Sequence, residues 1–239
     1  MIALAFDTAT ERCTVAAGDG ERVAHRFVDG ARRHAGAILG LVDAVLAELD
    51  VTASGIGRVI VANGPGSFTG LRVAASVAKA LAWRRDIEWC VAPSLLVRAA
   101  AHAPTGGGNV LALSDALRGE LYGASWRIDS AGIVRTSPSP RAMPPASLAA
   151  MQPVDVVVGS IPPQLIAAVA AATGREPVTG ESALPDARIL LMLANVAGGT
   201  TAVTDPAAWQ PEYGRPAEAQ VVWERAHGTE LPSAPGIAR

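Results

Sequence analysis

The sequence predicts an α/β protein of two subdomains, each built on a mixed sheet that helices cover. Three short apolar runs precede the first helical pattern, which is the order of a β-meander followed by a helix. Strand and helix patterns then alternate, as in a sheet whose later strands are reached by helical crossovers. The proline- and glycine-rich residues 104–108 divide the chain into two parts, and each part opens with a strand and a turn that contains aspartate.

The composition supports a large buried core. The chain has 239 residues, of which 50% are hydrophobic and 18% are charged, so disorder of the whole chain is excluded. The net charge of -2 creates no strong field toward nucleic acid or anionic membranes. With 4% aromatic residues, the chain also lacks the composition of a stacking platform for single-stranded nucleic acid.

The elements of the first part follow from their apolar patterns. Strands are predicted over residues 2–6, 13–17, 23–28, 59–62 and 87–91, and the first is a continuous apolar run suited to burial on both faces. The Gly18-Asp19-Gly20 stretch is typical of a hairpin turn between the second and third strands. Apolar residues at helical spacing predict helices over residues 32–49, 69–84 and 94–101.

The second part is predicted in the same way. The strands expected here are residues 110–113, 121–128 and 155–158, with an irregular proline-rich stretch at 137–145. Helical patterns cover residues 162–173, 186–197 and 214–224. These patterns divide the chain into an N-terminal α/β domain (1–104), a C-terminal α/β domain (105–210), a terminal helix that packs back on the body (211–227) and a flexible tail (228–239).

The densest motif runs from Asn63 to Arg72 and reads NGPGSFTGLR, between a predicted strand and a predicted helix. Glycines allow close backbone approach, and a helix N-terminus presents free N–H groups, so the motif is a plausible phosphate or carboxylate cradle. Its candidate contacts are Gly64, Gly66, Ser67, Thr69, Gly70 and Arg72. It is neither a Walker A loop nor a complete Gly-x-Gly-x-x-Gly motif. Spacing alone favours the competing interpretation, a tight strand-to-helix turn with Thr69 as the N-cap.

Two further polar groups stand at strand ends. Asp7 and Thr8 follow the first strand and could hold a metal-bound phosphate there, although a turn in which Asp7 caps its own backbone is favoured on local evidence. Asp115, Arg118 and Glu120 form a charged group between two later strands, for which a turn with a surface ion pair is the favoured interpretation.

The sequence gives little support for a metal site, a catalytic site, a reactive thiol or a membrane contact. The four histidines are not spaced as helical metal ligands, and no nucleophile–base set stands out, so we expect neither a metal nor catalytic residues. Cys13 and Cys90 lie in apolar runs and are expected to be buried, inert thiols. The chain begins without a signal-peptide pattern and contains no run of about 20 apolar residues, so no membrane contact and a cytoplasmic location are expected.

The two long helices of the first part are apolar around more than a narrow stripe. This excess apolar surface suits either a contact with another protein or cover by the second domain or the terminal helix.

Four sequence blocks together resemble the TsaB family, also called YeaZ. They are Ala5 to Thr10 (AFDTAT), Asn63 to Arg72, Ser114 to Tyr122 (SDALRGELY) and Pro211 to Arg215 (PEYGR), in the family's order. Leu117 stands where the family usually has a basic or polar residue, and Gly214 where it usually has leucine.

The resemblance implies an actin-like, Hsp70-like ATPase (ribonuclease H-like) fold. It implies a non-catalytic scaffold or activator subunit that helps to form N6-threonylcarbamoyladenosine at position 37 of tRNAs reading ANN codons. The expected partners are TsaD, the catalytic paralogue, and TsaE, with tRNA contacted indirectly and a homodimer also possible. TsaD would bind the helices of the first domain, at His34, Ile38, Leu41, Val42, Val45, Ala74, Ala75, Ala78 and Leu81.

Two other functions remain open from the sequence. The first is an ATP-dependent, kinase-like enzyme of the same fold that uses Asp7 and the glycine loop, so a nucleotide is the one cofactor to consider. The second is a peptidase of the M22 type. The chain lacks the His-x-x-x-His metal motif of TsaD-like proteins, which argues against the peptidase.

Overall fold

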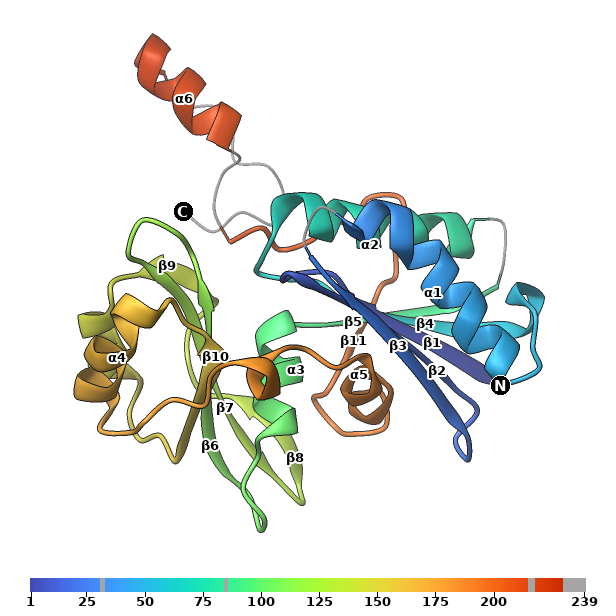
Figure 1. Ribbon diagram of the computed structural model, residues 1–239, viewed down its shortest axis with the longest axis horizontal. Helices are drawn as coiled ribbons and strands as arrows, with labels where there is room; N and C mark the ends of the chain where they lie inside the picture. The colour runs from blue at the N-terminus through green and yellow to red at the C-terminus, as the bar shows by residue number, and fades with distance from the viewer. Residues whose placement is uncertain (31–32, 84–85, 215–217, 230–239) are drawn as a thin grey trace.

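Two mixed β-sheets, with helices on both sides of each, form the body of the protein (Figure 1). The structure is a computed structural model that describes the chain except residues 31–32, 84–85, 215–217 and 230–239. The α/β class and the two mixed sheets that the sequence predicts are confirmed.

The first sheet has six strands in the order β11-β5-β4-β1-β2-β3. They are β1 (Ile2–Asp7), β2 (Arg12–Gly18), β3 (Val23–Asp29), β4 (Ile56–Ala62), β5 (Glu88–Ala92) and β11 (Thr201–Ala202). The first three strands form the predicted antiparallel meander, whereas β4 lies parallel to β1 and β5 parallel to β4.

The second sheet has the order β10-β6-β7-β8, and β9 also pairs with β7. Its strands are β6 (Gly108–Asp115), β7 (Leu121–Asp129), β8 (Gly132–Arg135), β9 (Arg141–Met143) and β10 (Val156–Ser160). β6 and β10 are parallel, and the other pairings are antiparallel.

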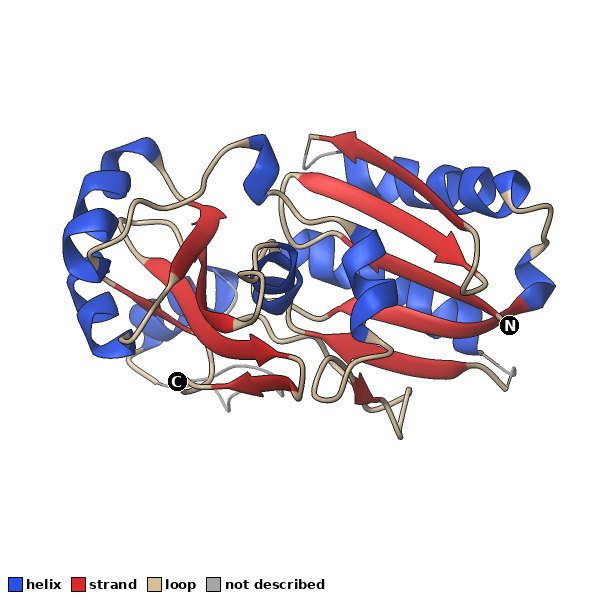
Figure 2. Ribbon diagram, turned by 90° about the horizontal axis from the view of Figure 1, so that it is seen from below, coloured by secondary structure: helices blue, strands red, loops and turns tan. Residues whose placement is uncertain are grey.

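The α-helices are α1 (His34–Glu48), α2 (Phe68–Ala82), α3 (Ser94–Ala101), α4 (Ile166–Thr173), α5 (Ala187–Leu193) and α6 (Glu218–His227). Short 3₁₀ turns lie at Ala53–Gly55, Pro145–Met151, Pro163–Leu165 and Glu181–Ala183. α1 and α2 cover one face of the first sheet, α3 and α5 lie between the two sheets, and α4 covers the far face of the second sheet (Figures 1 and 2).

β1 shows why a continuous apolar run becomes a strand in this fold. Leu4 and Phe6 belong to the core beneath α1 and α2, whereas Ala5 belongs to the core on the opposite face of the sheet. Successive side chains of a strand point to opposite faces, so a strand covered on both faces must be apolar at nearly every position. The run ends at Asp7, which is also fully buried.

The expected domain limits need a correction at the end of the chain's second part. The sequence assigns 105–210 to one domain, but α5 packs on β1 and β2, and β11 pairs with β5 at the edge of the first sheet. The first sheet has a second apolar face that needs cover, and a helical period does not show which sheet a helix will cover.

The terminal segment differs from expectation as well. Residues 211–214 lie against the body, with Pro211, Tyr213 and Gly214 buried, but α6 stands apart from both sheets (Figure 1). Its sequence, EAQVVWERAH, carries little apolar surface with which to hold the helix against the body. Of the expected flexible tail, residues 230–239 lie outside the described part of the chain.

Two further expectations concern membranes and thiols. No helix among the described residues is both long and apolar enough to span a bilayer. Cys13 and Cys90 are buried and free, as expected, and burial raises the pKa of the Cys13 thiol to about 12.

Candidate functional site

The glycine loop between β4 and α2 is packed against the turn between β1 and β2. The Ser67 N–H donates to the Ala9 carbonyl (2.7 Å), and the Thr8 hydroxyl donates to the Gly70 carbonyl (2.8 Å). A Cβ atom on Gly70 would overlap the Thr8 carbonyl oxygen, and one on Gly66 would overlap the Ala9 carbonyl oxygen. These glycines are therefore required for close approach of the chain's own backbone.

The segment 211–214 closes the other side of the loop. The Glu212 N–H donates to the Asn63 carbonyl (2.8 Å), and the Tyr213 ring lies 4.7 Å from that of Phe68. Gly64 has a φ of +104°, and a Cβ there would overlap the Glu212 carbonyl oxygen. The chain's own carbonyls therefore fill the close approach that these glycines allow, which favours the tight turn over the phosphate cradle.

The residues at the start of α2 take other roles. Ser67, not Thr69, is the N-cap, and its hydroxyl accepts from the Gly70 N–H at 3.2 Å. Thr69 and Arg72 are exposed, and the Arg72 guanidinium lies 5.5 Å above the Phe68 ring. The competing interpretation of this motif, a tight strand-to-helix turn, is correct, although its N-cap is two residues earlier than expected.

Asp7 caps its own turn, as the local pattern favours. Its Oδ1 accepts from the Ala9 N–H at 2.7 Å, while Oδ2 has no hydrogen-bond partner in the described structure. Burial raises the Asp7 pKa to about 6, against the opposing effects of the Ala9 hydrogen bond and the positive charge of Arg98. The carboxyl is fully buried, and a metal-bound phosphate at Asp7 stays a prediction.

Arg98, on α3, is a fully buried cation that the sequence analysis missed. Its Nη1 donates to the Leu113 carbonyl on β6 at 2.7 Å, so it joins α3 to the second sheet. Its Nε and Nη2 have no hydrogen-bond partner in the described part of the chain. Burial lowers the Arg98 pKa, and the charges of Asp7 and Glu11 act in the opposite direction. The signal available was an arginine inside the apolar run from Leu95 to Ala99.

A cleft of about 840 Å³ lies between the carboxyl ends of strands from both sheets, where α/β proteins often bind ligands. Its charged lining is mainly acidic and comprises Glu11, Asp29, Asp115 and Glu181, with Arg12 as its cation. The Arg12 guanidinium lies 2.8 Å from Asp29 and 3.5 Å from Glu181, so its charge is already neutralised. The cleft is thus electrostatically unsuited to a polyphosphate.

The charged group after β6 forms a turn. The Asp115 Oδ1 accepts from the Leu117 N–H at 2.7 Å, and Glu120 closes the turn through backbone bonds with Ala116 and Leu117. Leu117 and Arg118 both have left-handed backbones, with φ of 63° and 57°. The turn is therefore confirmed, and the surface ion pair expected with it stays a prediction.

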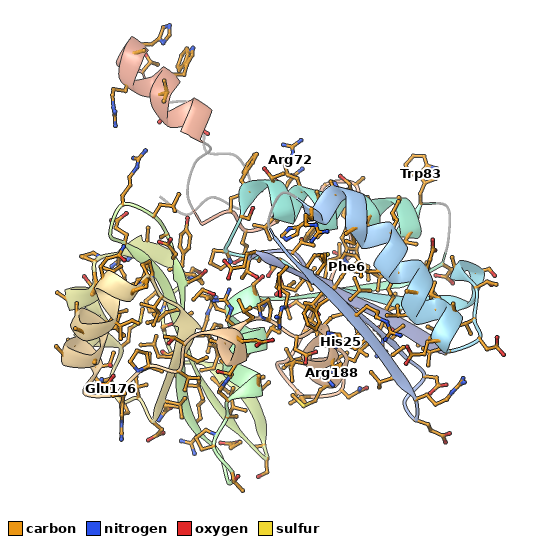
Figure 3. The ribbon with its side chains drawn as sticks, in the orientation of Figure 1. Phe6, His25, Arg72, Trp83, Glu176 and Arg188 are labelled. Carbon is orange, nitrogen blue, oxygen red and sulfur yellow. The ribbon has the colours of Figure 1, made fainter. Side chains whose placement is uncertain are left out.

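An apolar groove of about 500 Å³ lies between α1 and α2 on the side away from the sheet. Its lining comprises Ala35, Ile38, Leu39, Phe68, Thr69, Arg72, Val73, Ser76 and Val77. Leu39 is 60% exposed and Phe68 is 41% exposed. Figure 3 shows Arg72 and Trp83 projecting from α2 on its outer side, whereas Phe6 lies on the sheet side of the helices.

Most of the predicted interface residues do not line this groove. His34, Ile38, Val42, Val45, Ala74, Ala75 and Ala78 are buried within the chain, and Leu41 and Leu81 pack against the core beneath the helices. Most of these residues hold the helices on the sheet, whereas Leu41 and Leu81 are partly exposed and Ile38 also borders the groove. The physical reason is that small side chains let α2 approach its own sheet closely, as they would allow approach to a partner.

The side chains that a metal site would need are not clustered among the described residues. The described residues contain no group of three or more His, Cys, Asp or Glu side chains that could hold a metal ion. The His34 Nε2 lies 3.0 Å from the Glu11 carbonyl, and the His25 Nε2 lies 2.8 Å from the Thr14 hydroxyl. Both rings thus have structural partners.

Comparisons with known proteins agree with the motif blocks. Residues 28–142 match the family model "TsaD: tRNA N6-adenosine threonylcarbamoyltransferase". The protein TsaB of Escherichia coli K12, named as a tRNA threonylcarbamoyladenosine biosynthesis protein, is 35% identical over 131 residues, covering 54% of this chain and 57% of that one. The protein of the same name from Bacillus subtilis 168 is 31% identical over 123 residues, covering 51% and 53%. The chain thus spans about half the length of the curated relatives it matches.

Solved structures extend the likeness over most of the chain. YeaZ from Pseudomonas aeruginosa superposes with a TM-score of 0.69 at 28% identity, covering 81% of this chain and 90% of that one. A protein described as similar to peptidase YEAZ from Pseudomonas aeruginosa gives a TM-score of 0.74 at 28% identity, covering 90% and 99%. The resemblance to the TsaB (YeaZ) family and the actin-like ATPase fold is confirmed.

Proposed function

We propose that this chain is an accessory subunit of the complex that forms N6-threonylcarbamoyladenosine at position 37 of tRNAs reading ANN codons. It acts as a scaffold and activator and does not carry out the transfer itself. The observation that carries the proposal is the apolar groove between α1 and α2, an exposed surface that suits a protein partner. The names of the relatives supply the pathway.

The partner we propose for the groove is a TsaD-type transferase. Phe68, Leu39 and Val77 supply apolar area at the centre of the surface, and Arg72 supplies a cation at its rim. A TsaE-type ATPase joins the assembled pair, and tRNA is contacted mainly through the partners. A second copy of the chain can use the same groove, so homodimer and heterodimer compete.

The groove gives a direct test. Leu39→Arg and Val77→Arg place a charge in the apolar contact and are expected to weaken binding to the TsaD of the same organism about tenfold or more. The same variants should fail to restore tRNA modification in a mixture of purified partners, while the unmodified chain restores it. The chain alone should modify no tRNA. Affinity is measured by titration calorimetry, and the modified nucleoside by mass spectrometry.

Val134→Arg is the matched control, because Val134 is 64% exposed on β8 in the other domain. Thermal unfolding confirms that each variant is folded. Ala74→Arg and Ala78→Arg are unsuitable, because these side chains are buried in the chain's own core. Unchanged affinity in both groove variants would refute the groove as the contact, and modification of tRNA by the chain alone would refute the accessory role.

A kinase-like enzyme is the second candidate, since the cleft between the sheets has the place and size of a ligand site. The acidic lining disfavours ATP, so we propose that the subunit works without a nucleotide of its own. Titration with ATP and Mg²⁺ should give no saturable binding at millimolar concentration. Saturable binding that Asp115→Asn alters would instead favour the kinase-like function. For a peptidase of the M22 type, no supporting side-chain group is present in the described residues.

A further inference from the structure

A second cavity, of about 520 Å³, lies between the two sheets at β5 and β8 and is bounded by residues 198–203 and 209–212. Its apolar walls are Val91, Pro93, Leu96, Trp126, Val203 and Trp209. The volume is that of a typical small-molecule site. It is separate from the acidic cleft and from the groove between α1 and α2, whose linings share no residue with it.

The cavity contains two opposite charges that do not pair with each other. Arg135 stands directly across from Trp126 in the β7–β8 register, so the two side chains leave the sheet on the same face. Glu212 comes from the segment bound to the end of β4. Both residues are in the described structure, and no ion pair within 4.0 Å joins them, although the Arg135 charge still acts on Glu212. The space between them can hold a ligand that carries both charges.

The Asn63 amide lies beside the Glu212 carboxyl, and its oxygen has no hydrogen-bond donor in the described part of the chain. The residue is 7% exposed, and its Oδ1 has no hydrogen-bond partner in the described part of the chain. Its Nδ2 donates to the Glu212 Oε1 at 3.4 Å, which keeps the amide and the carboxyl side by side. The Oδ1 atom has almost no accessible surface, so the amide serves a ligand only by holding the Glu212 carboxyl in place.

The electrostatics of the Glu212 carboxyl suit it to bind a cation. Burial raises its pKa, whereas the Arg135 charge and the Asn63 hydrogen bond act in the opposite direction. A positive group placed beside it would replace the lost hydration of the carboxylate.

We propose that this cavity binds a free α-amino acid with an apolar side chain. The ammonium group donates to the Glu212 carboxylate, and the carboxylate of the ligand faces the Arg135 guanidinium. The side chain lies against Trp126 and Trp209. This arrangement satisfies both charges at once, which a purely anionic or purely cationic ligand does not.

The first measurement is the binding of L-phenylalanine to the full chain by calorimetry. L-Leucine and L-tryptophan are measured in the same way. N-acetyl-L-phenylalanine lacks the ammonium charge, and L-phenylalaninamide lacks the carboxylate, so each should bind about tenfold or more weakly. Glu212→Gln and Arg135→Gln should each weaken the binding of L-phenylalanine by a similar factor. Glu212→Gln should scarcely change the affinity for N-acetyl-L-phenylalanine, because the lost contact is to the ammonium group.

Arg127→Gln is the control, because Arg127 is exposed on β7, pairs with Asp129 and does not line the cavity. Thermal unfolding checks that all variants are folded, and at equal concentration the ligand should raise the midpoint of the parent chain more than those of the Glu212 and Arg135 variants. Absence of saturable binding by all three amino acids at millimolar concentration overturns the proposal. Equal binding by the parent, Glu212→Gln and Arg135→Gln overturns it as well.

Discussion

Gly70→Ala is expected to destabilise the protein by about 3 kcal/mol or more, although alanine is normally the better residue inside a helix. Gly70 lies in the first turn of α2, and its missing side chain leaves room for the Thr8 carbonyl oxygen. The Thr8 hydroxyl holds this approach by donating to the Gly70 carbonyl at 2.8 Å. An added methyl group must push α2 away from the turn between β1 and β2, and neither backbone can yield easily.

Urea unfolding of the parent and variant measures the effect. Gly40→Ala on α1 is the matched control, because a Cβ added at Gly40 would have nothing within 4 Å and the backbone there is ordinary helix. It should stabilise the protein by up to about 1 kcal/mol, since alanine loses less backbone entropy than glycine. If Gly70→Ala were as stable as Gly40→Ala, the close packing of the glycine loop would be refuted.

The glycine loop also shows what the sequence can reveal about a site. The pattern of Gly64, Gly66 and Gly70 correctly indicates that something approaches the backbone closely. It does not say what approaches, and the neighbours are carbonyl groups of Thr8, Ala9 and Glu212. Glu212 lies far along the chain, at a separation of 149 from Asn63. Only the fold brings it to the loop, so the sequence could not separate a ligand from the chain itself.

The helix faces show a second limit. Ile38 and Leu39 are neighbours in sequence and both strongly apolar, yet Ile38 is 1% exposed and Leu39 is 60% exposed. A helix that is apolar around most of its circumference has no stripe that marks the side facing the sheet. The sequence therefore predicts that α1 and α2 carry excess apolar surface, but not which residues carry it.

The strands were predictable where burial is complete. β1, β4, β6 and β10 are apolar runs bounded by turns, and each forms close to its expected place. β8 and β9 were missed, because Gly132–Arg135 and Arg141–Met143 are short and contain arginine. Their strand character comes from pairing with β7, which is a contact that local pattern does not encode.

Arg98→Met is expected to destabilise the protein by about 3–5 kcal/mol at pH 7, because it removes both the positive charge that acts on buried Asp7 and the hydrogen bond to the Leu113 carbonyl. In the parent chain, the burial of Asp7 already lowers the free energy of unfolding at neutral pH. The Asp7 pKa is about 6 in the folded state, against an ordinary value of 3.8, so the folded state binds more protons between these values. Stability therefore falls as pH rises from about 4 to about 6, by about 3 kcal/mol in all.

Without Arg98, the Asp7 pKa should rise further, since the arginine charge lowers it in the parent. The difference in unfolding free energy between Arg98→Met and the parent should therefore shrink as pH is lowered from 7 to about 4.5, where Asp7 is protonated in both folded proteins. Urea unfolding across this pH range measures it. A difference that stays constant with pH would show that Arg98 acts only through packing and its 2.7 Å bond to Leu113.

The double variant Asp7→Asn/Arg98→Met separates charge from shape. Asparagine can still accept from the Ala9 N–H, as the Asp7 Oδ1 does at 2.7 Å, but it carries no charge to desolvate. If the two residues are coupled through their charges, the double variant should be more stable at pH 7 than Arg98→Met alone, and this site should no longer make stability depend on pH between about 4 and 7. Additive effects of the two substitutions would mean that the attraction between the two charges contributes nothing to holding α3 between the two sheets.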